Sequence, residues 1–454
     1  MSQRSMDDKT IRSKILTMIL PITAENILQM TAGAVSMAMV GRISAVAVGA
    51  IGMSNVIFRI VWSIFKGLST GTSVFVAQSY GANNYKKLRS SSEQGFILSL
   101  GLSIILQQVL FWYAGTFLKL FNPTPDLLES GIMYLRIISW SLPFTAIILL
   151  VGGILQGMGN AKTPMVIIGI LNVVNIAFSF LIIFGNLGFP TLGLRGAGIA
   201  YVLAYITAAL IGLFVLFGKK GAFSTMQGKF DYKFNPKEAY SLFKFGLPTA
   251  FETSFWQIAS IIITRAILTY GETAYAAYQL GLQAEAISYM PATGFGIAAT
   301  TFIGQALGMR DMNLGKKYLK ELQKLTIIIT IVAGGALIFF PKIIMRILTD
   351  DLESVKIGAM YLFVMGIVQM PQNLAGLLNG ALRGAGFAKA PMINAGIGLW
   401  LVRIPFVMLM AFALKADIVW IWIGMGLDLT FRYLLAYYTF KRKDIFNKDI
   451  SLVE

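Results

Sequence analysis

The sequence predicts an all-α membrane protein of twelve transmembrane helices, arranged as two parallel six-helix repeats. Hydrophobic residues make up 56% of the 454 positions and charged residues 13%, and the mean hydropathy is +0.70. A water-soluble chain of this length needs more polar surface. The charges fall in short clusters between apolar runs of about 20 residues or more, long enough to cross a hydrocarbon core about 30 Å thick. The short alternating segments typical of a membrane β-barrel are absent.

One stretch of sequence occurs twice at a constant offset. Leu20-Pro21-Ile-Thr-Ala-Glu25 corresponds to Leu247-Pro248-Thr-Ala-Phe-Glu252, 227 positions later. The same offset relates further pairs without a gap, namely Gly67 and Gly294, Gln78 and Gln305, Gly81 and Gly308, and Lys162 and Lys389, whereas Pro143 and Pro371 slip by one. A repeat of this length is too long for a solenoid, so we infer a duplicated domain.

The apolar runs define six expected spans in each half. In the first half they run approximately from Ile15 to Val40, Ala47 to Ala77, Ser91 to Leu118, Ser130 to Gln156, Met165 to Phe184 and Ala197 to Phe217. In the second half they run approximately from Phe245 to Leu268, Ala274 to Leu307, Leu325 to Phe340, Gly358 to Leu382, Met392 to Leu414 and Ile418 to Phe440. An even number of spans per half lets both halves enter the membrane from the same side, as parallel repeats.

The positive charges indicate the orientation. The termini and alternate loops hold 25 of the 38 Lys and Arg residues, and the opposite loops hold 7. Because positively charged loops stay in the cytoplasm, we expect a multi-pass protein of the plasma membrane with both termini cytoplasmic. The expected domains are a first lobe at 1–217, a lysine-rich cytoplasmic linker at 218–244, a second lobe at 245–440 and a cytoplasmic tail at 441–454. This topology accounts for the net charge of +17, so we expect no nucleic-acid partner.

Histidine and cysteine are both absent. Their absence excludes a disulfide scaffold, a Cys/His zinc site, a thiol nucleophile and an imidazole base. The chain also lacks a Gly-x-x-x-x-Gly-Lys-Ser/Thr phosphate loop, which argues against direct ATP drive. We therefore expect a protein that is not an enzyme and that uses no cofactor.

Four acidic residues fall well inside the expected spans: Glu25, Glu252, Glu285 and Asp428. An unpaired charge at that depth costs on the order of 3 kcal/mol by insertion scales, so each is expected to face a cavity, form an ion pair or carry a proton. Glu25 and Glu252 follow a proline by one helical turn, where a freed backbone carbonyl opens a polar niche. Two readings stay open: a matched pair of cation or proton sites, or two carboxylates that cap broken turns.

Glu252 has polar neighbours in the sequence. Gln257 follows it on the same span, and the next span carries Gln279, Gln283 and Glu285, with the two glutamines on one helix face. We expect adjacent helices to bring both carboxylates to one cavity, where two like charges favour uptake of a proton or Na⁺.

Asp428 precedes Arg432 by four residues, a spacing that favours a local ion pair and a structural role. Other cations at membrane depth are candidate counter-charges: Arg59, Lys66, Arg136, Arg265 and Arg403. Near the acids, Trp256, Tyr289 and Met290 are candidates to line a cavity for flat, apolar cargo, with ordinary packing as the alternative.

Several short motifs occur in a characteristic order. They are Leu20-Pro-Ile-Thr-Ala-Glu25-Asn-Ile-Leu-Gln29, Met39-Val-Gly41-Arg42, Ala277-Tyr-Gln279, Met290-Pro291-Ala-Thr-Gly-Phe-Gly296, Ala298-Ala-Thr-Thr-Phe-Ile-Gly304-Gln305, Arg383-Gly-Ala-Gly386 and Trp400-Leu-Val-Arg403. In this order, size and duplication, the chain resembles the bacterial multidrug and toxic compound extrusion (MATE) family over nearly its whole length.

The resemblance implies two six-helix lobes that form a V around a central cavity, and export of organic cations or drugs in exchange for H⁺ or Na⁺ by alternating access. Glu252 and Glu285 match acidic positions that recur in similar bacterial members, and Glu25 and Asp428 match family positions with less defined roles. Where relatives typically read Val-Asp-Thr, this chain reads Val35-Ser36-Met37, so an acid of the first lobe is missing. The expected polar lining of the cavity in the first lobe is Gln29, Ser36, Asn172 and Asn175, which release no proton.

We therefore expect ion coupling chiefly in the second lobe, in a monomer that meets small organic cations and the lipid bilayer. A flippase for a lipid-linked or amphiphilic envelope precursor is the main alternative, because cations at membrane depth can bind phosphate. An intramembrane enzyme and a passive channel or receptor are minor alternatives.

Overall fold

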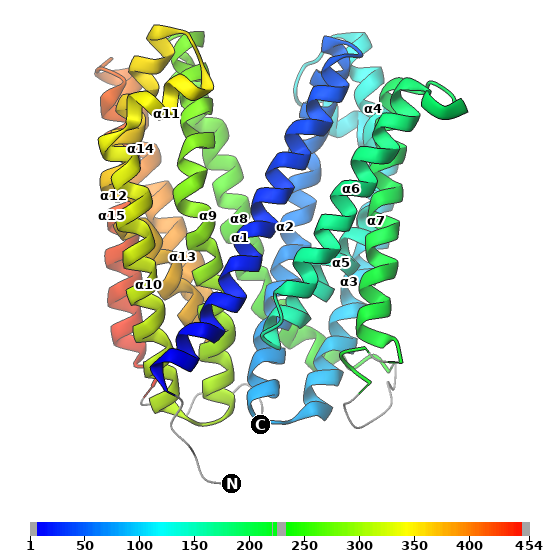
Figure 1. Cartoon of the computed structure of the whole chain (residues 1–454). Helices are drawn as coiled ribbons and strands as arrows, with labels where there is room; N and C mark the ends of the chain where they lie inside the picture. The colour runs from blue at the N-terminus through cyan, green and yellow to red at the C-terminus, as the bar shows by residue number, and fades with distance from the viewer. Residues whose placement is uncertain (1–6, 220, 225–232, 447–454) are drawn as a thin grey trace. The chain divides into compact units, whose positions relative to one another are not determined.

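The computed structural model describes residues 7–219, 221–224 and 233–446, and all regular secondary structure in these ranges is helical (Figure 1). Residues Arg4, Lys220 and Lys229, together with the expected tail from position 447 onward, lie outside the described residues.

The first repeat forms seven α-helices. They are α1 (Asp8–Gly41), α2 (Ala45–Gly81), α3 (Tyr85–Lys119), α4 (Pro125–Ser139), α5 (Leu142–Gly157), α6 (Lys162–Phe184) and α7 (Gly193–Phe217), with a short 3₁₀ turn, η1 (Asn186–Gly188), between the last two. Local signals fix several of the starts. Ser44 and Asn84 accept a backbone N–H at the beginning of α2 and α3, and a proline occupies the first position of α4.

The second repeat follows the same order. Its helices are α8 (Pro236–Leu268), α9 (Glu272–Gly308), α10 (Met312–Phe339), α11 (Pro341–Leu348), α12 (Leu352–Gly384), α13 (Lys389–Ile397), α14 (Ile404–Met408) and α15 (Val419–Lys443). Two π-helical segments, η2 (Gly398–Arg403) and η3 (Leu409–Ala413), flank α14.

All twelve expected spans coincide with helical segments, which confirms the all-α membrane fold. Ten helices among the described residues are long and apolar enough to cross a membrane. The expected span from Ser130 to Gln156 is a pair, α4 and α5, bent by 50° at Trp140 and Ser141. The remaining expected span, Phe245 to Leu268, lies within α8, which starts earlier than expected because Pro236 and Glu238 suit a helix N-terminus.

The offset of 227 seen in the sequence holds for the backbone. Adding it to the bounds of α2 gives the bounds of α9, and adding it to the start of α4 and the end of α5 gives the bounds of α12. It also relates Asn83 to Arg310, two non-glycine residues whose φ angles are 54° and 56°. The duplicated sequence therefore encodes a duplicated local structure.

The chain packs as two compact units, Ala24–Ala250 (the N-unit) and Met1–Thr23 together with Phe251–Glu454 (the C-unit). The predicted lobes follow the sequence repeat, whereas each packing unit contains the first part of the helix that opens the other repeat. The two boundaries, after Thr23 and after Ala250, are again 227 residues apart, and each lies two residues beyond a proline inside the helix, Pro21 in α1 and Pro248 in α8.

Within each unit, helices approach closely where one of them presents a glycine. A Cβ atom on Gly157 of α5 would lie 2.7 Å from the carbonyl oxygen of Ser73 in α2. A Cβ atom on Gly384 of α12 would lie 2.5 Å from the carbonyl oxygen of Thr300 in α9. These two contacts are related by the same offset, so equivalent glycines let equivalent helices pack closely in both units.

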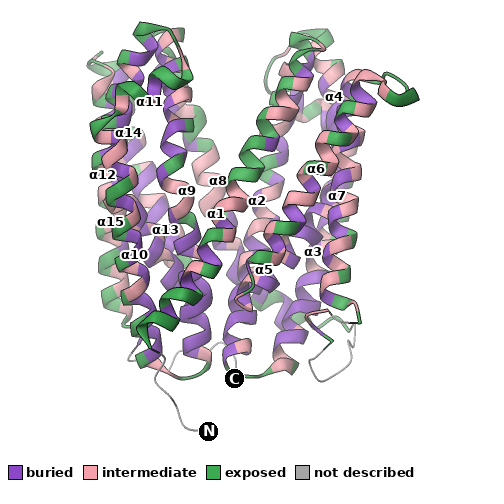
Figure 2. Ribbon diagram, viewed as in Figure 1, coloured by how far each residue is buried: buried purple, intermediate pink, exposed green. Residues whose placement is uncertain are grey.

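The outward faces of the helices are apolar. Phe214 on α7 is 75% exposed and Phe339 on α10 is 78% exposed, as expected where the surrounding solvent is lipid. Figure 2 shows the buried residues running along α9, whereas α11 is largely exposed.

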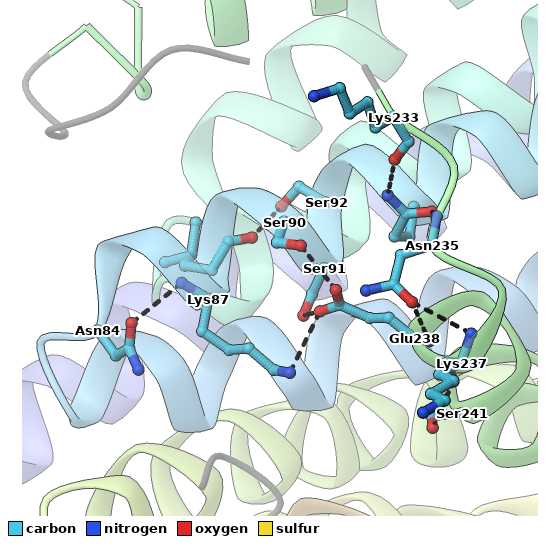
Figure 3. Close-up of polar contacts among 12 residues, drawn as sticks. Asn84, Lys87, Ser90, Ser91, Ser92, Lys233, Asn235, Lys237, Glu238 and Ser241 are labelled. Carbon is cyan, nitrogen blue, oxygen red and sulfur yellow. Dashed lines mark hydrogen bonds and ion pairs between the residues drawn. The ribbon is translucent and has the colours of Figure 1, made fainter. Parts of the chain in front are cut away.

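The end of the linker is tied to α3 inside the N-unit (Figure 3). Gln94 donates to the carbonyl oxygen of Lys233 at 2.8 Å and accepts from the backbone N–H of Asn235 at 2.9 Å. The Glu238 carboxylate accepts hydrogen bonds from Ser90 at 2.6 Å and Ser91 at 3.0 Å. Lys87 pairs with the same carboxylate at 3.4 Å. This network fixes the first turn of α8.

Candidate functional site

Glu285 lies buried within the C-unit and is 5% exposed. Tyr361 donates a hydrogen bond to its Oε2 atom, and the Gln369 amide donates to Oε1 at 2.9 Å. Both donors come from α12, which packs along α9 over a long interface. Gly281 makes room for this approach, since a Cβ atom there would lie 2.5 Å from the Tyr361 ring. Neutral donors rather than a direct ion pair therefore surround this carboxylate.

An aromatic cluster encloses the Tyr361 side of Glu285. The Tyr361 ring meets Tyr278 edge-on at 5.5 Å and Trp422 edge-on at 5.0 Å, and the Tyr278 and Trp422 rings stack at 5.5 Å. All three rings are buried. This packing fixes the Tyr361 hydroxyl against the carboxylate.

Glu252 has a different environment on α8. Its carboxylate pairs with Arg383, near the end of α12, at 2.5 Å. The side chains are 16% and 19% exposed, so the pair retains some access. Charge-assisted bonds between a guanidinium and a carboxylate are among the stronger polar contacts in proteins.

Asp428 is the most enclosed acid of the four, with a side chain that is 0% exposed. It pairs with Arg403 at 2.7 Å and with Arg432 at 2.9 Å. The ion pair with Arg432 confirms the prediction from their spacing, and Arg403 is a counter-charge as anticipated. Two guanidinium groups on one carboxylate leave this triad with a surplus positive charge.

The backbone around the triad is specialised. Arg403 ends the π-helical segment η2, and π-helical turns within α-helices occur frequently at functional sites. Gly398 opens the same segment, and a Cβ atom there would collide with the Asp428 carboxylate and the Arg432 side chain. Only glycine admits the triad at this position.

Trp256 faces the triad from α8. The Arg432 guanidinium lies 4.4 Å and that of Arg403 4.9 Å from the centre of its ring, distances at which cation–π attraction is effective. The sequence left this ring either lining a cavity for cargo or packing within the protein. In the structure it contacts two arginines of its own unit.

The structure gives the two coupling candidates separate partners. We expected adjacent helices to bring Glu252 and Glu285 to one cavity. In the structure, each carboxylate is bonded to its own set of residues. Gln279 donates to the Tyr275 hydroxyl at 2.8 Å, and Gln283 is exposed. The other predicted cavity residues of this unit, Gln257, Tyr289 and Met290, are half-buried.

The N-unit brings together fewer of its predicted residues. Ser36 donates to the Asn175 carboxamide at 3.0 Å, and Gln29 is exposed. Among the described residues, the amide nitrogen of Asn172 and the Oε2 atom of Glu25 are buried without a hydrogen-bond partner. Lys66 is the charged residue that attracts the Glu25 carboxylate electrostatically.

A hollow of about 560 Å³ lies along α4, but none of the predicted site residues lines it. Its charged members are Glu129 and Arg136, and Arg136 donates to the carbonyl oxygen of Phe111 at 3.0 Å. Within the described ranges, no three acidic side chains form a group that holds a metal ion. A Na⁺ ion bound at Glu252 or Glu285 would therefore need amide, hydroxyl or carbonyl oxygens as further ligands.

Sequence reasoning missed three partners of the acids. Tyr361 and Gln369 lie 76 and 84 residues from Glu285, and Arg383 lies 131 residues from Glu252. The only available signals were the polar positions on one apolar helix and the Arg383-Gly-Ala-Gly386 motif, and neither indicates which acid is contacted.

Comparisons with known proteins agree with this architecture. A family model described as MatE matches residues 21–181 and again residues 248–409, so the two matches start 227 residues apart. A "Probable multidrug resistance protein NorM" of Thermotoga maritima is 30% identical over 427 residues, which is 94% of this chain and 91% of the relative. The "Probable multidrug resistance protein YoeA" of Bacillus subtilis is 25% identical over 98% of this chain and 97% of its own length.

Solved structures share the fold at low identity. A multidrug resistance MATE family transporter in its outward-facing conformation has a TM-score of 0.88 at 17% identity, over 96% of this chain and 97% of that one. A MOP superfamily transporter from Pyrococcus furiosus has a TM-score of 0.87 at 17% identity, over 95% of this chain and 96% of that one.

Proposed function

Because the chain belongs to the MatE family of multidrug and toxic compound extrusion transporters, we propose that it is a secondary active antiporter that exports organic cations in exchange for H⁺ or Na⁺. The family consists of transporters rather than enzymes and needs no cofactor. The multidrug relatives support the extrusion of small molecules, and the ion exchange is the further step of the proposal.

The observation that carries the proposal is the uneven distribution of membrane acids. Of the four membrane acids, the C-unit holds Glu252, Glu285 and Asp428, and the N-unit holds Glu25 alone. Helix α2, which corresponds to α9, carries Phe58 at the position of Glu285. Phe58 and Tyr134, the counterpart of Tyr361, belong to one apolar core cluster. Ion exchange requires a group that changes charge, so we place it at Glu252 and Glu285.

Each of the two acids is suited to a different part of the cycle. Glu285 is enclosed by neutral donors, so it can hold a proton without breaking an ion pair. Glu252 is partly accessible, and an entering cation can compete there with Arg383. Exchange follows if the ion and the cargo favour different conformations, because a ligand without such a preference shifts no equilibrium.

The remaining parts of the proposal concern location and assembly. We place the transporter in the cytoplasmic membrane with both termini inside, on the excess of Lys and Arg in the termini and alternate loops. We propose that one chain is the working unit, because the two repeats supply both halves that an alternating-access cycle requires.

Dye efflux from proteoliposomes tests the function. A Na⁺ gradient and a pH gradient are imposed separately on vesicles that contain the full-length chain and a cationic dye. We expect one of the two gradients to drive accumulation of dye against its own gradient, and dissipation of that gradient to abolish it. Dye movement that only equilibrates, whichever gradient is imposed, would contradict the proposal.

A further inference from the structure

Six charged side chains of the C-unit form a series of alternating sign, which we call the charge series. In order, it comprises Arg383, Glu252, Arg432, Asp428, Arg403 and Glu285. Its members come from α8, α9, α12, α15 and η2, so they lie far apart in the sequence.

Direct ion pairs make three of the five links. Arg383 binds Glu252 at 2.5 Å, and Asp428 binds Arg432 at 2.9 Å and Arg403 at 2.7 Å. The other two links act through the field: Arg432 interacts electrostatically with Glu252, and Arg403 with Glu285. The Asp428 triad therefore interacts electrostatically with both carboxylates to which we assign coupling.

Trp256 holds the middle of the series in place. Both guanidinium groups lie over its ring, at 4.4 Å and 4.9 Å from the centre. Trp256 also belongs to α8, four residues after Glu252, so one helix carries both the first acid and the ring that positions the triad. A bend or rotation of this helix would move both at once.

The charge count of the series decides its response to a cation. With both glutamates ionised, three carboxylates balance three guanidinium groups. A proton or an organic cation at either glutamate leaves one positive charge in surplus, in surroundings where screening by water is weak. A second cation at the other glutamate would double that surplus.

We propose that Asp428, Arg403 and Arg432 are positioning residues that couple the charge of Glu252 to that of Glu285, so that a cation at one carboxylate weakens cation binding at the other. This inference rests on the proposed function, which identifies the two glutamates as the exchange groups. It adds a mechanism to that function: an ion at one glutamate and a cationic cargo at the other weaken each other's binding, although they occupy different sites.

Other groups around the series do not provide this link. Tyr361 and Tyr278 face the Glu285 end from α12 and α9, and phenols are neutral near pH 7. Gln369 adds an uncharged amide. The guanidinium groups of the triad are therefore the charges that connect the two carboxylates.

A proton titration of the purified full-length chain tests the proposal. The difference in proton uptake between a protein and its Glu285→Gln derivative isolates the proton held by Glu285. The titration midpoint of this proton is measured first in the otherwise unmodified chain and then in a chain that carries Glu252→Gln. Both measurements are repeated in chains that also carry Arg403→Gln and Asp428→Asn, a pair of substitutions that removes one charge of each sign. Arg403→Lys is the matched control, because it retains the positive charge.

We expect Glu252→Gln to lower the midpoint of Glu285 proton uptake by about one pH unit, a tenfold change in proton affinity. The reason is positional: Arg432, no longer attracted by Glu252, binds Asp428 more closely, which frees Arg403 to move toward Glu285 and favour its ionised form. The shift should persist with Arg403→Lys and fall below about a third of that size in the Arg403→Gln/Asp428→Asn background. If that double variant does not fold, Asp428→Asn/Arg432→Gln breaks the series on the other side of Asp428 and is expected to have the same effect.

Equal midpoint shifts in the intact and broken series would overturn the inference, as would the absence of any shift in the intact protein. Dye export by the unmodified chain is measured on the same preparations. Absence of ion-driven export would defeat the proposed function, whereas equal shifts alongside intact export would defeat the inference alone.

Discussion

Helices α2 and α9 have the same length and corresponding bounds, but opposite chemistry at one position. Phe58 in α2 lies in an apolar core with Tyr134, whereas Glu285 in α9 binds the equivalent tyrosine, Tyr361. The backbones match because glycines at equivalent positions let neighbouring helices approach. The comparison teaches that duplication preserved the scaffold in both repeats, whereas at this position only the second repeat carries a buried acid.

The largest effect is expected from the Asp428 triad. Asp428→Asn leaves two buried guanidinium groups without their carboxylate, which should lower the free energy of unfolding by about 3–5 kcal/mol. Glu238→Gln, in the N-unit network of Figure 3, should cost only about 1 kcal/mol, because one of Ser90 and Ser91 can still donate to the amide oxygen while the other accepts from the amide nitrogen. Thermal unfolding of both variants in detergent provides the measurement. Equal losses of stability in the two variants would show that the Asp428 triad stabilises the fold no more than the Glu238 network does.

Glycine contacts should have intermediate effects that are alike in the two units. Gly153→Ala forces a Cβ atom against Ser69, and Gly380→Ala forces one against the backbone of Gly296, at positions related by the 227 offset. Each variant is expected to lose about 1–3 kcal/mol of stability through overpacking. The controls are Gly152→Ala and Gly376→Ala, which meet no atom within 4 Å and should be neutral or slightly stabilising. A loss of stability in only one of the two variants would show that the repeats do not pack equivalently at this position.

Helix caps should give the smallest effect. Asn84 and Asp311, also related by the offset, accept a backbone N–H at the start of α3 and α10. Replacement of either by alanine is expected to cost about 1 kcal/mol, and replacement by glycine only a few tenths of that. The same thermal assay measures both caps, and a cost at one cap only would show that the repeats differ at this turn.

Most of the scaffold follows from local sequence. Apolar runs between charge clusters located all twelve spans, and the repeated Pro, Gly and Lys positions located the duplication. The Asp428–Arg432 pair was predictable because residues four apart lie on one helix face. The break between α4 and α5 has no such signal, since the corresponding stretch in α12 continues as one helix.

The rest of the site depends on tertiary packing. Nothing near Glu252 in the sequence indicates Arg383, and nothing near Glu285 indicates Tyr361, because those contacts form only when α8 and α9 pack against α12. The sequence offered Trp256 as a possible surface for cargo or as an ordinary packing residue, since cation–π attraction favours any nearby cation. The nearest cations turned out to be Arg403 and Arg432 of the same unit.

Transport in inverted membrane vesicles tests most directly the claim that the second repeat carries the ion exchange. Ion-driven export of a cationic dye is compared for Glu252→Gln, Glu285→Gln and, from the first repeat, Asn175→Ala, with the amount of each protein in the membrane measured in parallel. The account predicts that each glutamate variant loses most of its ion-driven export, whereas Asn175→Ala retains dependence on the same ion gradient. Ion-driven export left intact by both glutamate variants would contradict it.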